Sequence, residues 1–283
     1  MRLIRAELLK ARRRQATWVL LIAMLAIMGL IYLVAGIGFR ALGAIEFPGA
    51  YALIGQFGFG LGGLLALVYA AALVGADWNW GVIRQVIARG ESRTMYLLAK
   101  AAALAILLAI ALVIIFAFGI VMTYLSGAIW GVPVASPLRG RGLFNLVDWL
   151  VLTYPVLLHR AVIGMAVAVI LRSQLAGAIV GVVLFLGEPI LRLMFIGLTM
   201  AGANFDGFVD GIQRLGLQWW QFLPITVGDY VANAAPGAVN LQGSFEGLFI
   251  EPVPLALGLP AVLIYLALTV GAALLAFNRQ EIV

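Results

Sequence analysis

Cysteine is absent from this chain, histidine occurs once, as His159, and charged residues make up only 11% of the 283 residues. The missing cysteines exclude disulfides, thiolate metal ligands and cysteine nucleophiles. The motifs HExxH, GxSxG and SxxK are also absent, so neither a zinc peptidase nor a nucleophile–histidine pair is supported. We expect no catalytic residue, no metal site and no cofactor in the chain itself.

The sequence consists largely of long apolar runs and contains few charged residues. A soluble domain carries about 25% charged residues, whereas this chain is 64% hydrophobic and has a mean hydropathy of +1.11. Apolar runs of about 18 residues or more indicate transmembrane helices, and the pattern of a membrane β-barrel is scarce. We expect an all-α membrane protein with one transmembrane domain over residues 1–283. The six expected spans run from about 17 to 37, 53 to 76, 96 to 125, 147 to 171, 175 to 200 and 257 to 277.

Basic residues flank these spans unequally. One side of the membrane would carry Arg2, Arg5, Lys10, Arg12, Arg13, Arg14, Arg84, Arg89, Arg93, Lys100, Arg172 and Arg279, and the other Arg40, Arg139, Arg141 and Arg214. This asymmetry predicts a multi-pass protein of the cell membrane with both termini in the cytoplasm. The net charge of +6 is therefore explained by topology and by anionic lipid, and we expect no nucleic-acid partner.

The N-terminal residues 1–15, MRLIRAELLKARRRQ, form an amphipathic pattern. Leu3, Ile4, Leu8 and Ala11 share roughly one helical face, which predicts an interfacial helix with its apolar side in the lipid. A cleaved signal peptide is the alternative, but the basic region and the apolar core that follows are both too long for one.

The segment 77–93 separates the second and third expected spans. Val82, Ile83, Val86 and Ile87 form one face of a short helix, and Arg84, Gln85 and Arg89 form the other. Gly90 would end this helix in a left-handed conformation, and Ser92 would cap the next one. Because an apolar stripe needs something to pack on, we expect it to contact lipid or a partner protein.

This segment resembles the type-2 permeases of ATP-binding-cassette exporters. The resemblance is carried by Asp77, Gly81, Gly90, the Gly-x-Ser-Arg run and Lys100, and by the LLKARRR start, the FLP segment and the FNRQEIV tail. It implies that the short helix is a cytoplasmic coupling helix that docks on a separate ATPase subunit, and that the permease is dimeric, with a second copy or a sibling. The residues implied for ATPase coupling are Asp77, Gly81, Val82, Arg84, Val86, Arg89, Gly90, Ser92 and Arg93.

The chain has no phosphate-binding loop of its own. Such a loop needs Gly-Lys-Ser/Thr, but both lysines, Lys10 and Lys100, precede alanine. ATP and Mg²⁺ are therefore expected on the partner subunit. Gly58, Gly60 and Gly63 spell GxGxxG inside an apolar span, where close helix packing explains them better than a dinucleotide fold.

Four polar residues fall inside the fourth and fifth expected spans: His159, Arg160, Glu188 and Arg192. Charges at this depth are costly, so we expect them to be paired or to face a wet cavity. Antiparallel spans would put Arg160 and Glu188 at similar depth, where they can pair, and the i, i+4 spacing also lets Glu188 reach Arg192 on its own helix. The pair would either line a transport route or hold two helices together. Pro189 would weaken the helix beside Glu188.

The segment 201–256 is the largest external element, and its aromatic residues suggest that it packs on the outer face of the membrane. As a whole, we interpret the chain as the membrane subunit of an ATP-driven exporter for an amphipathic drug, peptide or lipid. One alternative is a proton-coupled transporter that uses Glu188, His159 and Arg160. A second alternative is a membrane scaffold or immunity subunit that binds a peptide without moving it.

Overall fold

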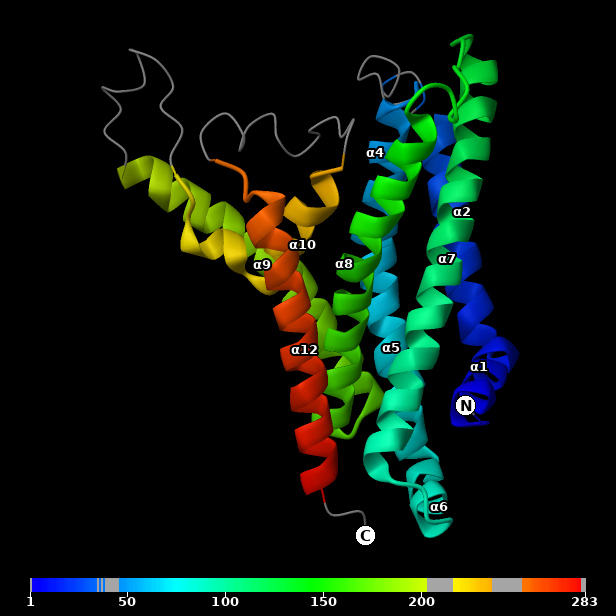
Figure 1. The fold of residues 1–283 in the computed structure, drawn as a ribbon, viewed down its shortest axis with the longest axis vertical. Coiled ribbons are helices and arrows are strands. Elements are labelled where there is room, and N and C mark those ends of the chain that lie inside the picture. Colours follow the sequence, from blue (N-terminus) through cyan, green and yellow to red (C-terminus); the bar gives the residue numbers. More distant parts are fainter. Residues whose placement is uncertain are drawn as a thin grey trace.

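The computed structural model describes residues 2–34, 36, 38, 46–202, 216–235 and 251–280. In these ranges the secondary structure is helical, and no β-strand occurs. Six stretches are long and apolar enough to cross a membrane, and each overlaps one of the six expected spans. The all-α fold with six spans is therefore confirmed (Figure 1).

Five of the six spans are longer than the sequence predicted, and the first, α2, is not. The helices that form them are α2 (Gln15–Val34), α4 (Gly49–Gln56) with η1 (Phe57–Leu61) and α5 (Gly62–Asn79), α7 (Arg93–Trp130), α8 (Gly142–Leu171), α9 (Gln174–Gly202) and α12 (Leu255–Arg279). The additional elements are α1 (Arg2–Arg13), α6 (Val82–Ala88), η3 (Trp219–Phe222) and α10 (Pro224–Asn233). At about 1.5 Å per residue the 38-residue α7 is about 57 Å long, so it exceeds the bilayer and runs the length of the molecule (Figure 1).

The helix α6 marks one end of the molecule, which we call the α6 end. The helix α1, the start of α7 and the C-terminal end of α12 also lie toward it (Figure 1). The turn between α8 and α9, at Arg172 and Ser173, lies at the same end. We call the opposite end the far end.

Close packing of α5, α8 and α9 forms the centre of the bundle. A Cβ added at Gly164 of α8 would overlap the backbone of Leu67, and one at Gly75 of α5 would overlap Gln174. These glycines let the three helices approach each other, as small residues do between membrane helices. In the most apolar stretch of the second span 67% of the residues are buried, whereas only 11% are buried in the corresponding stretches of α9 and α12.

The glycine motif falls on the second span, as expected. A Cβ added at Gly58 would lie 3.3 Å from Leu112, and one at Gly63 would meet the Arg160 side chain, but nothing lies within 4 Å of a Cβ at Gly60. Two of the three glycines therefore serve close packing. The π-helical turn η1 contains the first two, Gly58 and Gly60.

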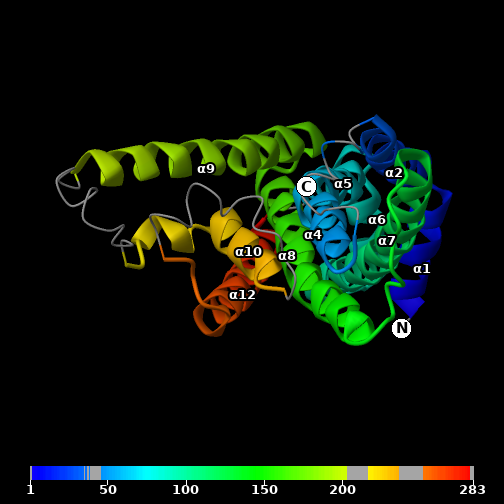
Figure 2. The same cartoon turned by 90° about the horizontal axis from the view of Figure 1, so that it is seen from above.

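Residues 219–233, which include η3 and α10, pack against other helices of the bundle. Helix α10 packs against α8 and α12, while the end of α9 leans outward (Figures 1 and 2). Trp220, Val227 and Val231 are at most 1% exposed. Residues 219–233 therefore pack against the chain's own helices, and their position at the membrane's outer face stays a prediction. Phe205 and Phe208, also expected there, lie outside the described residues.

The N-terminal helix α1 forms as predicted, and its buried side chains are Ala11, from the predicted apolar face, and Glu7, which is not part of that face. It packs against α7, with Ala11 fully buried and Glu7 7% exposed. Leu3, Ile4 and Leu8 are only half-buried. The inward face of α1 is therefore partly charged, and its partners are described next.

Candidate functional site

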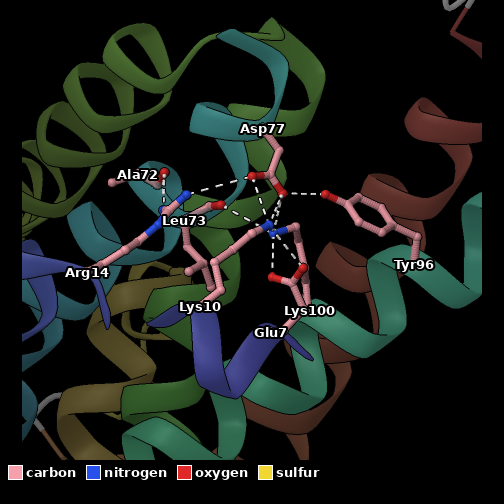
Figure 3. Close-up of polar contacts among 8 residues, drawn as sticks. All are labelled: Glu7, Lys10, Arg14, Ala72, Leu73, Asp77, Tyr96 and Lys100. Carbon is pink, nitrogen blue, oxygen red and sulfur yellow. Dashed lines mark hydrogen bonds and ion pairs between the residues drawn. The ribbon is translucent and has the colours of Figure 1, made fainter. Parts of the chain in front are cut away.

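Six polar side chains meet at the α6 end, and we call them the Asp77 cluster. Its members are Glu7, Lys10, Arg14, Asp77, Tyr96 and Lys100 (Figure 3). They come from α1, the α1–α2 corner, α5 and α7, so the cluster joins segments that are distant in the sequence.

Lys100 is the centre of the cluster. Its Nζ lies 2.6 Å from Oδ2 of Asp77 and 2.7 Å from Oε2 of Glu7. Nζ of Lys10 lies 3.2 Å from an oxygen of each of the same two carboxylates. Nη2 of Arg14 lies 3.7 Å from Oδ1 of Asp77. The Tyr96 hydroxyl also donates a hydrogen bond to Asp77. Both carboxylates are therefore shared between cations.

Burial makes this pairing necessary. The side chains of Asp77 and Lys100 are 0% exposed. An isolated charge removed from water costs several kcal/mol, and removal of one partner from a buried pair typically costs about 3–5 kcal/mol. The cluster thus fixes α1 against α5 and α7, and Asp77 is structural here instead of facing a partner. Its implied role in ATPase coupling stays a prediction.

The short helix α6 follows the cluster after two residues of turn. Gly81 precedes it with a φ of 66°, and Gly90 follows it with a φ of 85°, both in the left-handed region. The Ser92 side chain accepts a hydrogen bond of 3.2 Å from the backbone N–H of Met95 and caps α7. The short helix, the glycine break and the cap are all at the expected positions.

The two faces of α6 have different surroundings. Ile83 is 2% exposed, and Val86 and Ile87 pack on the hydrophobic core of this chain. The chain's own core therefore covers Ile83, whereas Val86 and Ile87 are only partly buried, and the expected contact of the stripe with lipid or a partner stays a prediction. Arg84 and Arg89 are exposed.

The base of α6 is tied to the other helices at this end. Trp78 stacks edge-on against Phe277 of α12 at 5.8 Å, and the Arg172 guanidinium lies 5.8 Å from the Trp78 ring. Arg93 donates hydrogen bonds to the carbonyls of Asn278 at 3.3 Å and Gln280 at 2.6 Å. The turn after α8 and the end of α12 therefore both contact the α5–α7 connection.

A second group of charges, which we call the Arg160 cluster, lies within the membrane-spanning region. Arg160 is 1% exposed and pairs with Asp229 of α10. Its guanidinium also donates to the carbonyl of Phe59 in η1 and, at 3.4 Å, to that of Ile225. Arg192 of α9 lies 3.7 Å from Asp229. The cluster connects α8, α9, α10 and the second span.

Glu188 has a different partner from the expected one. Its Oε1 accepts a hydrogen bond of 2.6 Å from the backbone N–H of Thr226, in the first turn of α10. Within the described residues Arg160 pairs with Asp229, so the predicted Arg160–Glu188 pair is wrong. The physical reason is that α10 enters the bundle between α8 and α9 and supplies both an acid and a helix N-terminus.

His159 lies beside these charges without joining them. Its ring stacks on Tyr265 at 5.9 Å, and neither ring nitrogen has a hydrogen-bond partner in the part of the chain that the structure describes. No direct hydrogen bond joins His159 to Arg160 or Glu188 among the described residues. In the same described ranges, no group of three His, Asp or Glu side chains could hold a metal ion.

Sequence reasoning assigned no site role to five members of these clusters: Glu7, Lys10, Arg14, Tyr96 and Asp229. A signal for Glu7 exists, because Glu7, Lys10 and Arg14 recur at i, i+3 and i+7 on one face of α1. Asp229 carries no such signal, since it was assigned to an external segment.

Comparison with known proteins agrees with this architecture. A search of curated proteins finds none that matches the chain. The family described as ABC-2 family transporter protein matches residues 3–188, which include α1, the Asp77 cluster, α6 and the first five spans as far as Glu188. The chain, with its six apolar spans and this match over more than half its length, belongs to the ABC-2 transporter family.

Proposed function

We propose that the chain is the membrane-spanning subunit of an ATP-driven exporter. A separate ATPase subunit would bind ATP and Mg²⁺, because the chain lacks a phosphate-binding loop. The cargo would be amphipathic: a drug, a peptide or a lipid. Membership of the ABC-2 transporter family supports a role in membrane transport.

The single observation that carries the proposal is the exposed polar face of α6. Arg84, Gln85 and Arg89 face solvent, while Ile83 on the opposite face is 2% exposed and anchors the helix to the bundle. A short helix fixed in this way is a rigid protrusion. Two guanidinium groups on it suit an acidic or polar groove on a cytoplasmic partner.

The connections of α6 provide a path for force. In the chain, α6 lies between α5 and α7. An ion pair links those two helices next to α6, with Nζ of Lys100 2.6 Å from Oδ2 of Asp77. A displacement of α6 would therefore move the start of α7, and this long helix would carry the movement toward the far end. In this interpretation the Asp77 cluster transmits force instead of contacting the ATPase.

A second copy, or a sibling, would complete the transporter. Large apolar side chains are exposed along α9 and α12, among them Val183, Ile190, Leu193, Ile264 and Leu268. Lipid covers such surfaces in a monomer, and a transport route between two copies would have apolar walls of this kind. An amphipathic cargo fits that route better than a small ion does.

Co-purification tests the ATPase partner. The tagged full-length chain would be purified in detergent from its native cells, and mass spectrometry would identify any polypeptide carrying a phosphate-binding loop.

The test variant is Arg84→Glu with Arg89→Glu. Its matched control is Arg139→Glu with Arg141→Glu, since these two arginines are exposed at the far end. We expect the test variant to lose at least about 90% of the bound ATPase, as reversal of interface charges disfavours association. Equal recovery from both variants would contradict the proposed contact.

Transport needs a separate measurement. Inside-out vesicles containing the complex should take up the amphipathic dye rhodamine 6G when ATP and Mg²⁺ are added. A proton gradient that drives uptake without ATP would instead support a secondary transporter. ATPase binding without uptake of dye, phospholipid or peptide would support a scaffold.

A further inference from the structure

An apolar cavity opens between α2, α5 and α7, away from both charged clusters. Its lining includes Leu21 and Met24 of α2, Leu65 and Ala66 of α5, and Ala111 of α7. The cavity volume is about 170 Å³. Its lining atoms are almost all carbon, so water would find few hydrogen-bond partners there.

Small residues on two of these helices create the hollow. Gly62 and Ala66 of α5 and Ala111 of α7 all line it, where larger side chains would fill the space. For comparison, an engineered protein cavity of about 150 Å³ stays dry and binds benzene. The volume here therefore suits a hydrocarbon segment of about six carbons.

The cavity faces the bilayer. Two of its lining residues, Trp18 and Ile110, are 50% and 53% exposed on membrane-spanning helices. Because an unfilled apolar space forfeits dispersion contacts, hydrocarbon from the adjacent leaflet would occupy it. The opening thus identifies the occupant as an acyl chain.

The end of the cavity nearest α1 is polar and basic. Thr17 lines it, shares a 2.9 Å hydrogen bond with the Tyr69 hydroxyl and donates one of 2.7 Å to the carbonyl of Ala11. The Trp18 indole donates to the carbonyl of Arg12 at 2.9 Å, which fixes the ring against the α1–α2 corner. Arg12 and Arg13 are both exposed at this corner. Clusters of basic residues next to a membrane attract anionic headgroups.

We infer that this cavity is a specific site for one anionic phospholipid from the leaflet at the α6 end. One acyl chain fills the cavity between α2, α5 and α7, and the phosphate lies beside Arg12 and Arg13. The site is distinct from the exposed surfaces of α9 and α12, which lipid would cover without selection. The inference does not depend on the proposed ATPase partner or on the direction of transport.

Native mass spectrometry of the full chain tests the site. The protein would be reconstituted in vesicles of equal parts phosphatidylglycerol and phosphatidylcholine, re-extracted in detergent, and analysed for retained lipid. We expect one phosphatidylglycerol per chain. Ala111→Phe fills the cavity and should lower retention at least about tenfold, because each excluded methylene weakens binding several-fold. The matched control is Ala117→Phe, on an exposed position of the same helix, and it should leave retention unchanged.

A second pair of variants tests the headgroup without altering the cavity. Arg12→Gln with Arg13→Gln should reduce the preference for phosphatidylglycerol over phosphatidylcholine at least about tenfold. Arg139→Gln with Arg141→Gln, at the far end, should not change it. Equal retention by folded Ala111→Phe and Ala117→Phe, or an unchanged preference in Arg12→Gln with Arg13→Gln, would overturn the inference. These outcomes are independent of ATPase binding, so failure here leaves the proposed function standing.

Discussion

Lys100 of α7 lies 2.6 Å from Asp77 of α5, and both side chains are fully removed from solvent. The helix α6 is the connection between their two helices, so this ion pair closes the base of the protrusion that we propose as the ATPase contact. The stability of that base should depend on each charge having its partner.

Loss of Lys100 should destabilise the protein strongly. Lys100→Met leaves Asp77 and Glu7 buried with fewer cations, so we expect a loss of about 3–5 kcal/mol in the free energy of unfolding. The matched control is Lys10→Met, whose side chain is 31% exposed and whose loss should cost about 1 kcal/mol or less. Thermal unfolding of the detergent-purified protein, followed by tryptophan fluorescence, measures both. Equal midpoints for the two variants would contradict the central position of Lys100.

The glycines that flank α6 should resist substitution because of their backbone conformation. Gly90 has a φ of 85° and no atoms within 4 Å of an added Cβ, so Gly90→Ala introduces strain without a clash. We expect a cost of about 1–2 kcal/mol, seen as faster hydrogen exchange at the amides of α6. Gly187→Ala is the control, since that glycine is helical, has no positive φ and also has open space around it. Unchanged exchange in Gly90→Ala would show that α6 does not need a left-handed residue after it.

Substitutions of Glu188 should separate its hydrogen bond from its charge. Glu188→Gln retains an oxygen that can accept from Thr226, so we expect near-normal levels of folded protein. Glu188→Leu leaves the Thr226 N–H without this acceptor and should cost about 1–3 kcal/mol. Size-exclusion chromatography of both variants measures the folded fraction. If Glu188→Gln keeps its level but loses dye transport, the carboxylate has a role in the transport route as well.

Cysteine labelling should establish the orientation and the exposed face of α6 together. The chain has no cysteine, so an introduced one is labelled without background. Gln85→Cys should react with a membrane-impermeant maleimide in inside-out vesicles but not in intact cells, as the positive-inside rule predicts. Ile83→Cys should react much more slowly, because Ile83 is 2% exposed. Arg139→Cys is the opposite-end control and should react in intact cells. Labelling of Gln85→Cys in intact cells would reverse the topology.

The apolar runs and the residues that end or cap helices predicted most of the fold. The apolar runs located all six spans, and the Gly81, Gly90 and Ser92 signals located α6 and the start of α7. The positions of these helices depend on residues that are close together in the chain, so they can be predicted from the sequence alone. All spans but the first were predicted too short because their ends include polar or aromatic residues, such as Trp130, that continue the helix beyond the apolar core.

The partners in the two charged clusters could not be predicted in the same way. The chain places Asp229 in a segment that has the composition of an external loop, and only the entry of α10 into the bundle brings it to Arg160. Whether the stripe of α6 would meet lipid, another protein or its own chain depended likewise on tertiary packing. In the structure Ile83 packs on the chain's own core. An apolar side chain at this position would equally suit contact with lipid, with another protein or with its own chain, so the sequence could not distinguish them.

The π-helical turn Phe57–Leu61 has an effect far from its own position. Such a turn accommodates about one extra residue, so the part of the span that follows is rotated by about 100° relative to an uninterrupted helix. In this register the Phe59 carbonyl is turned toward Arg160, and Asp77, near the other end of the same span, is turned toward Lys100. The π-helical turn in the middle of the span thus sets the direction in which the Asp77 carboxylate points near the end of the same span. In a regular α-helix, that carboxylate would point away from Lys100.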